Sequence, residues 1–178
     1  MATCTFRLCA AVVLATASAG AWAQTPPIKP GLWEVKSEGS VDGRKTAQPA
    51  DRLQGLSPSV RAQLEASMKE KGVAMGAGGV NRICFARESM DPARWGESMS
   101  CKTEYGTRSN SSWKWHSVCS QPEMTIDGEA IFANPESYRI HTTTTRTMRG
   151  EVKTSQRTVQ ARWLSADCGD LKPFDPKR

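Results

Sequence analysis

Alternation of apolar and polar residues dominates the second half of the chain. From residue 101 onward, segments with a period of two are separated by short polar turns, which is typical of antiparallel strands. An earlier segment at 32–37 alternates in the same way, and 80–85 is apolar enough to add a further strand. The predicted strands of the second half are 101–107, 111–119, 123–133, 137–148 and 151–164. The pattern predicts a mainly β (α+β) fold, a curved antiparallel sheet or partly open barrel of about six to seven strands.

The two strands around Asn110 define their own pairing. Folding the chain at Asn110 sets Cys101 opposite Cys119 and Tyr105 opposite Trp115. One face then carries Cys101, Thr103, Tyr105, Trp113, Trp115 and Cys119, and the other carries Lys102, Lys114 and His116. Because one register satisfies the cysteines, the aromatic residues and the charges, we predict a Cys101–Cys119 disulfide. This pairing leaves Cys84 for Cys168.

The last predicted strand has a break in its pattern. Val159, Ala161 and Trp163 share one parity, whereas Val152 has the other. We expect a β-bulge between Val152 and Val159 to bring both apolar sets onto one face.

One amphipathic helix is predicted at about 57–71. Ser57 is a suitable N-cap, Pro58 suits the first helical position, and Gly72 supplies a left-handed stop. Apolar residues recur every four positions, at Val60, Leu64 and Met68. We expect this face to pack on the sheet; a mobile lid or a partner-binding helix is the alternative. A short helical turn is also expected near 90–95.

The N-terminal residues 1–23 have the pattern of a secretory signal peptide. Arg7 precedes an apolar run from Leu8 to Ala23, and the run ends in the small-x-small sequence Ala21-Trp22-Ala23. The run is shorter than the about 20 apolar residues that a membrane-spanning helix needs. We predict cleavage after Ala23 and an exported protein without a transmembrane segment, in which 24–178 forms a single disulfide-stabilised β-rich domain.

Cleavage would leave four cysteines, which suits two disulfides in an oxidising compartment. Their separations include no Cys-x-x-Cys pair, which disfavours structural zinc and dithiol redox chemistry. Loss of Arg7 would leave 23 basic against 18 acidic residues, a net charge of +5 that is spread along the chain. An exported chain of this charge is expected to have no nucleic-acid partner.

Several short sequences together resemble a known family. They are the early KPGLWEV (29–35), Ile83-Cys84 before a short turn, the hairpin bracketed by two cysteines, and the closing ARWLSADCG (161–169). With the helical insert and the strand at 137–148, they are similar to exported bacterial proteins grouped as the domain-of-unknown-function family numbered 3617. The resemblance implies a periplasmic location and disulfides, and it carries no established activity.

Catalytic signatures are absent from the sequence. His116 and His141 lie on predicted strands beside Lys114 and Arg139, which favours exposed histidines over an activating base. No nucleophile elbow, zinc-protease or phosphate-loop motif occurs. We therefore expect a protein that is not an enzyme, with no cofactor and no metal site; hydrolysis is the least favoured alternative.

The first strand raises the question of a ligand. Gly31-Leu32-Trp33 resembles the Gly-x-Trp opening of lipocalin-type barrels, which hold small apolar molecules. An aromatic-lined concavity is predicted from Trp33, Tyr105, Trp113, Trp115 and Trp163, and it would bind an apolar or amphipathic molecule or an envelope component. Such a cup requires an apolar cavity beside Trp33 of at least about 300 Å³. The alternative is a structural or protein-interaction module in which these aromatic residues are core.

Overall fold

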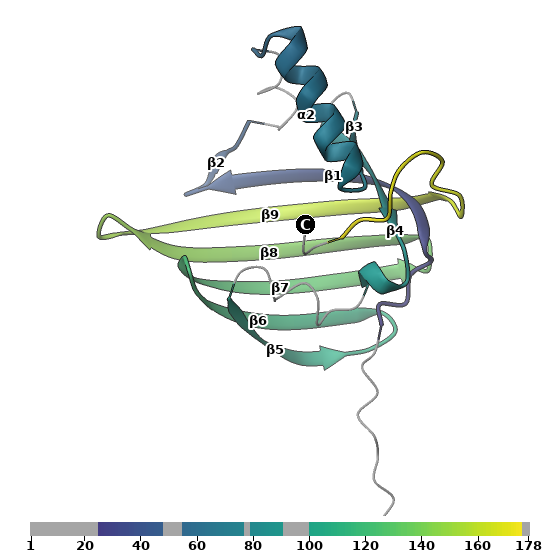
Figure 1. Ribbon diagram of the computed structural model, residues 1–178. Helices are drawn as coiled ribbons and strands as arrows, with labels where there is room; N and C mark the ends of the chain where they lie inside the picture. The colour runs from purple at the N-terminus through teal and green to yellow at the C-terminus, as the bar shows by residue number, and fades with distance from the viewer. Residues whose placement is uncertain (1–24, 48–54, 77–78, 91–99, 176–178) are drawn as a thin grey trace, which may run out of the picture.

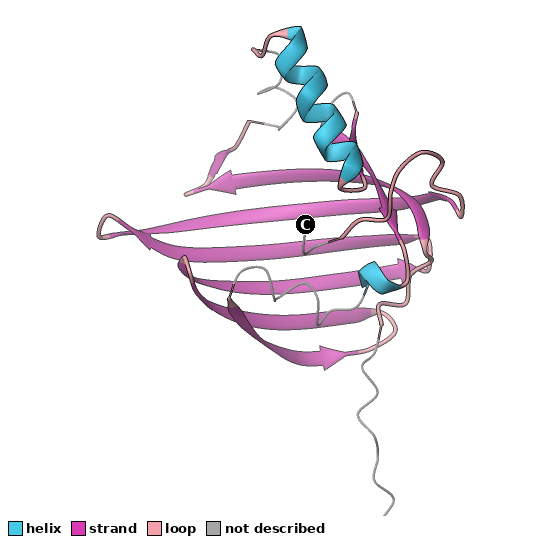
Figure 2. Cartoon of the chain, in the orientation of Figure 1, coloured by secondary structure: helices cyan, strands magenta, loops and turns pink. Residues whose placement is uncertain are grey.

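The computed structural model describes residues 25–47, 55–76, 79–90 and 100–175. Nine strands of these residues form one antiparallel sheet in the order β3-β4-β1-β9-β8-β7-β6-β5, with β2 paired to β1. Figure 1 shows that the sheet is strongly curved, and Figure 2 shows that most of the described chain is strand rather than helix. The strands are β1 (Gly31–Val41), β2 (Arg44–Lys45), β3 (Val73–Met75), β4 (Val80–Phe85), β5 (Cys101–Arg108), β6 (Ser112–Ser120), β7 (Glu123–Asn134), β8 (Ser137–Met148) and β9 (Glu151–Ser165).

The predicted mainly β fold with one helix and two disulfides is confirmed, but the expected number of six to seven strands is too low. The two missing strands are β2, with two residues, and β3, with three. Strands this short contain too few residues to show an alternating pattern, so only their neighbours reveal them. The described strands form an open sheet, with β3 and β5 at its two edges.

The hairpin of β5 and β6 has the predicted register. Cys101 lies opposite Cys119, and Tyr105 lies opposite Trp115. The Cys101–Cys119 disulfide joins this directly opposed pair, whose Cα atoms are 3.9 Å apart. The second disulfide is also confirmed, because Cys84 is bonded to Cys168.

The bulge expected between Val152 and Val159 is not present. The pairing of β8 with β9 runs without interruption from Met148 opposite Glu151 to Ser137 opposite Arg162. Val152 points to solvent and is 65% exposed. It does not have to share a face with Val159, so no bulge is needed. A register shift occurs instead at the other end of β9, where it pairs with β1 at Leu32 and Trp33.

Helix α2 (Pro58–Glu70) has the predicted bounds, with Ser57 at its N-cap position. Its apolar face does not pack on the sheet as expected: none of its residues is buried, and Val60 and Leu64 are exposed. The helix contacts the edge strand β3 and projects beyond β1 (Figure 1).

The C-terminal segment occupies apolar surface of the core in place of the helix. The Cys84–Cys168 bond ties this segment to β4, and the N–H of Phe174 donates to the carbonyl of Cys84. The ring of Phe174 packs edge-on against Phe85, with their centroids 6.0 Å apart. This segment therefore provides part of the cover that the sequence pattern assigned to the helix.

Two further predictions fall on residues that are only partly described. The 3-10 helix η2 (Glu88–Met90) ends where the turn near 90–95 was expected to begin, and positions 91–95 lie outside the described residues. The predicted signal peptide, 1–23, also lies outside them.

The core consists of two adjoining clusters on the concave side of the sheet. Ile28 and Tyr138 pack against both clusters and join them. The buried members are Trp33, Val35, Phe85, Met90 and Ala161 in the first cluster, and Trp113, Ala130 and Phe132 in the second.

Candidate functional site

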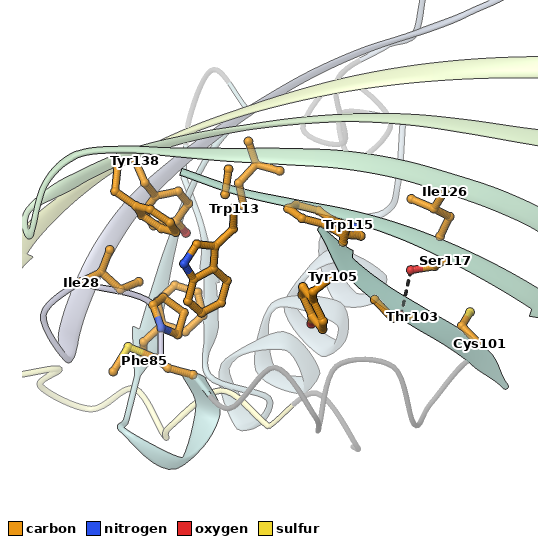
Figure 3. Close-up of a pocket in the computed structure, with 15 residues that line it drawn as sticks. Ile28, Phe85, Cys101, Thr103, Tyr105, Trp113, Trp115, Ser117, Ile126 and Tyr138 are labelled. Carbon is orange, nitrogen blue, oxygen red and sulfur yellow. Dashed lines mark hydrogen bonds between the residues drawn. The ribbon is translucent and has the colours of Figure 1, made fainter. Parts of the chain in front are cut away.

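An apolar cavity of about 220 Å³ lies against the concave face of the sheet (Figure 3). Strands β5 to β8 provide one wall, and the segment before β1, the end of β4 and the 3-10 helix η2 provide the other. The sheet wall consists of Cys101, Thr103, Tyr105, Trp113, Trp115, Ser117, Ile126, Ala130, Tyr138, Ile140 and Phe132. The opposite wall consists of Pro26, Ile28, Phe85 and Met90.

Strand alternation positions the sheet wall. Residues two apart on one strand point to the same face, and the register aligns these sets across neighbouring strands. Trp113 lies opposite Ala130, which lies opposite Ile140 on the next strand. Phe132 and Tyr138 form another such pair. The inward-facing side chains of four strands therefore line the same cavity.

A glycine determines how one ring of the wall lies. Trp115 is opposite Gly128 on β7, and its indole covers the space where a side chain of residue 128 would begin. A Cβ atom at Gly128 would come within 2.1 Å of the Cε2 and Cζ2 atoms of Trp115. The missing side chain therefore lets the indole lie close to the sheet, which leaves room beside it.

Ring contacts and hydrogen bonds fix the other aromatic residues. Trp113 packs edge-on against Phe132 at a centroid distance of 5.7 Å, and its Nε1–H donates to the carbonyl of Ser109 at 3.1 Å. Phe132 in turn lies 6.5 Å from Tyr138. Burial raises the pKa of Tyr138 far above its usual value, because the charged phenolate would lose its hydration. This wall is therefore neutral and rigidly held.

The structure brings three of the five predicted ligand residues into the cavity wall. Tyr105, Trp113 and Trp115 line it. Trp33 is fully buried behind Tyr138, with their ring centroids 5.1 Å apart, and Trp163 packs on the same core cluster. Neither Trp33 nor Trp163 is part of the lining. The cavity is also smaller than the expected 300 Å³ and does not lie beside Trp33.

Two hydroxyl groups of the lining bind each other. Thr103 Oγ1 and Ser117 Oγ lie 2.8 Å apart across β5 and β6, near the disulfide. No Asp, Glu, His, Lys or Arg is among the described residues that line the cavity. The described wall thus provides apolar contact area and no ionisable group suited to proton transfer at neutral pH.

A second, polar depression of about 560 Å³ continues along the same concave face. Ile126 lines both spaces and marks where they meet. The polar side chains of this depression include Ser37, Thr142, Thr144, Ser155 and Arg157. The threonine run at 142–145 thus contributes two residues to this face and none to the apolar cavity. The concave face therefore changes from apolar to polar along its length.

Both histidines are exposed on strands, but one of them has a partner that the sequence did not reveal. His116 Nδ1 lies 2.7 Å from Oδ1 of Asp127, on the neighbouring strand. The exposure predicted for both histidines is confirmed, and Asp127 becomes a neighbour of His116 only when β6 pairs with β7. His141 Nδ1 contacts Thr158 Oγ1 at 3.1 Å.

The described parts of the chain have neither a metal-binding cluster nor a membrane-spanning helix. Within them, no three His, Cys, Asp or Glu side chains gather in a group able to hold a metal ion. None of the helices formed by these residues has the length and apolarity required to cross a membrane.

Comparison with known proteins gives one family. Residues 28–168 match the profile described as "Protein of unknown function (DUF3617)". An uncharacterized protein in the lpd-3 5'region of Pseudomonas putida is 30% identical over 112 residues, which cover 59% of this chain and 77% of that protein. No solved structure matches the chain significantly.

Proposed function

The chain belongs to the DUF3617 family of proteins of unknown function, and from its geometry we propose that it is an exported, non-enzymatic binding protein for a small apolar or amphipathic molecule. The observation that carries the proposal is the aromatic cavity on the concave face of the sheet. Ligand sites are typically apolar concavities with few polar groups, and this cavity has that composition.

The size of the cavity limits what enters it. At about 220 Å³ it is below the range of about 300–1,000 Å³ that is usual for sites enclosing a drug-sized ligand. A slender group such as an alkyl chain suits it better than a polycyclic molecule. The adjoining polar depression gives the rest of such a ligand a surface to contact.

The proposal that the protein works outside the cytoplasm rests on two features. Both described disulfides join cysteines distant in sequence, and such bonds persist mainly in oxidising compartments. The N-terminal pattern of 1–23 is that of a secretory signal peptide. A periplasmic location accounts for both features, and amino-terminal sequencing of the exported protein tests it.

A pair of alanine variants tests the cavity. Ala130 lines it, whereas Ala161 is equally buried in the neighbouring cluster and does not line it. Ala130→Leu adds three carbon atoms to the cavity wall, and Ala161→Leu adds the same atoms outside the lining. We expect the neutral fluorescent probe N-phenyl-1-naphthylamine to bind the unaltered protein saturably and Ala130→Leu at least about tenfold more weakly, a loss of about 1.4 kcal/mol.

The control variant separates filling of the cavity from general strain. Ala161→Leu is expected to lose stability by overpacking but to retain the probe affinity of the unaltered protein. An equal loss of affinity in both variants, or no saturable binding by the unaltered protein, would count against the cavity as the site. Thermal unfolding of both variants reports their stabilities alongside.

Helix α2 supports a second candidate function, that of a protein-interaction module. Val60 and Leu64 are exposed on a helix that has no buried residue. Exposed apolar side chains on a projecting helix are typical of surfaces that bind a partner. Loss of a co-purifying envelope protein from a Leu64→Gln variant, with probe binding unchanged, would favour this function.

A further inference from the structure

An irregularity in β5 turns an arginine toward the aromatic wall. Tyr105 lies opposite Trp115, but the next aligned pair is Arg108 with Trp113, so the register shifts between them. In a regular strand, residues 105 and 108 would point to opposite faces. The shift instead brings Arg108 onto the face of the two lining residues Tyr105 and Trp113. Bulges commonly redirect side chains beside functional sites.

Arg108 lies against two rings of the cavity wall and is not itself part of the lining. Its guanidinium carbon lies 3.6 Å from the ring centroid of Tyr105 and 5.1 Å from that of Trp113. Both rings line the apolar cavity. A group bound to this guanidinium would therefore lie next to a chain held in the cavity.

The guanidinium also has an unused donor. Nε of Arg108 is buried and has no hydrogen-bond partner among the described residues. Buried N–H groups without a partner are rare in native structures, so each of them needs an explanation such as a bound water or ion or a functional role. The N–H groups of a guanidinium lie in its plane, so contact of one face with the Tyr105 ring does not occupy them.

We propose that the ligand is a carboxylic acid with an apolar tail, and that Arg108 binds its carboxylate while the cavity holds the tail. This inference rests on the proposed function, because it assigns the head group of the molecule that enters the same cavity. A guanidinium edge donates two parallel hydrogen bonds to a carboxylate, and one of them would use the unpaired Nε–H. Its contacts with the Tyr105 and Trp113 rings hold the group in place before the ligand arrives.

Arg157 also lies on the concave face, and its setting differs from that of Arg108. It lines the polar depression, is exposed, and already donates through Nε to Ser37 Oγ at 2.6 Å. Because its Nε has a partner, it is the weaker candidate for the same role. Arg157→Gln therefore serves as a direct comparison with Arg108→Gln.

The test uses two probes with the same tail. Binding of dodecanoic acid and of dodecan-1-ol is measured by tryptophan fluorescence at pH 7.5, with both disulfides intact. We expect Arg108→Gln to weaken dodecanoate binding about 10- to 100-fold, the effect of losing charge-assisted hydrogen bonds, and to leave dodecanol binding unchanged. Arg108→Lys keeps the charge and loses the two-bond geometry, so an intermediate loss is expected.

Two variants serve as controls. Arg139→Gln removes a charge from an exposed position of β8 that does not line the cavity, and Arg157→Gln removes the arginine that lines the polar depression. Both are expected to bind the two probes as the unaltered protein does. Unchanged dodecanol affinity in Arg108→Gln also shows that this variant retains its fold.

The outcomes separate this inference from the proposed function. Equal binding of both probes to the unaltered protein and to Arg108→Gln would overturn the carboxylate assignment and leave the apolar site standing. A loss of dodecanoate binding in Arg157→Gln alone would likewise overturn the role of Arg108. Failure of both probes to bind the unaltered protein would overturn the cavity function, and the inference with it.

Discussion

The packing of Trp115 over Gly128 gives the most specific prediction about the site. Gly128→Ala adds one methyl group, and its carbon would lie 2.1 Å from two atoms of the indole. Carbon atoms in contact are separated by about 3.5–4.0 Å, so the ring must move away from the strand. Because Trp115 lines the cavity, the ring is expected to move into that space.

Two opposing effects determine the magnitude. Forcing an extra carbon into packed surroundings costs about 1–3 kcal/mol. Replacing glycine by alanine recovers about 0.4–1 kcal/mol, because the unfolded chain loses conformational freedom. We expect Gly128→Ala to lower the free energy of unfolding by about 0.5–2.5 kcal/mol. In a domain of this size the midpoint of thermal unfolding would fall by roughly 1–10 °C.

The measurement is urea unfolding followed by circular dichroism, together with titration of the neutral probe. Gly106→Ala is the matched control, because a Cβ atom there meets nothing nearer than the Lys114 carbonyl oxygen at 3.8 Å. The control should be as stable as the unaltered protein or slightly more so. Gly128→Ala should also bind the probe more weakly, because the displaced indole narrows the cavity.

A double-mutant cycle tests the cause. In a Trp115→Ala background the added methyl group meets no ring, so Gly128→Ala should no longer destabilise the protein. The coupling free energy is expected to be about 1 kcal/mol or more. If Gly128→Ala is as stable as Gly106→Ala, or if it costs the same with and without Trp115, the proposed close contact does not govern this part of the fold.

Three further predictions address other parts of the molecule. Replacing Cys84 and Cys168 by serine should lower the free energy of unfolding by about 4.5 kcal/mol, because the disulfide closes a loop of 84 residues. A loss of less than about 1 kcal/mol, measured by urea unfolding, would refute this loop-entropy estimate. The pKa of Asp42 is lowered in the folded protein, chiefly by a hydrogen bond from the Thr154 N–H. The ionised Asp42 therefore stabilises the fold fully above the ordinary pKa of about 4. This stabilisation is lost as the pH falls through the lower pKa of the folded state. Asp42→Asn should therefore flatten the stability profile below pH 4, and an unchanged acid profile would contradict this. Leu64→Gln should change stability by less than about 0.5 kcal/mol, since the side chain is exposed; a loss of 2 kcal/mol would show that the helix packs on the domain.

Local patterns predicted much of the sheet. The strand predicted at 137–148 has the bounds of β8, and the symmetric sequence around Asn110 gave the register that pairs Cys101 with Cys119. These features depend on alternation within one segment or between two adjacent ones. Such short-range information is present in the sequence, because a strand buries one face whatever its distant neighbours are.

Less of the candidate site could be predicted. Tyr105, Trp113 and Trp115 were found because they share one hairpin, whereas Trp33 was added because Gly31-Leu32-Trp33 resembles the opening of lipocalin-type barrels. Arg108 was missed, since a bulge redirects it and the pattern assigned it to the turn. Bulges change which side chains face the cavity without leaving a period in the sequence.

The sequence by itself determined the strand periodicity, the helix with its cap and stop, and the disulfide pairing, because each follows from local geometry or from the register of one hairpin. Only the tertiary structure decided that the C-terminal segment covers the core in place of helix α2, and that His116 gains Asp127 as a neighbour. It also decided that Trp33 is core while Trp113 lines a cavity. The physical reason is that the alternation along a strand specifies which side chains point inward. The curvature of the sheet and the segments that pass over it specify which residues those side chains contact.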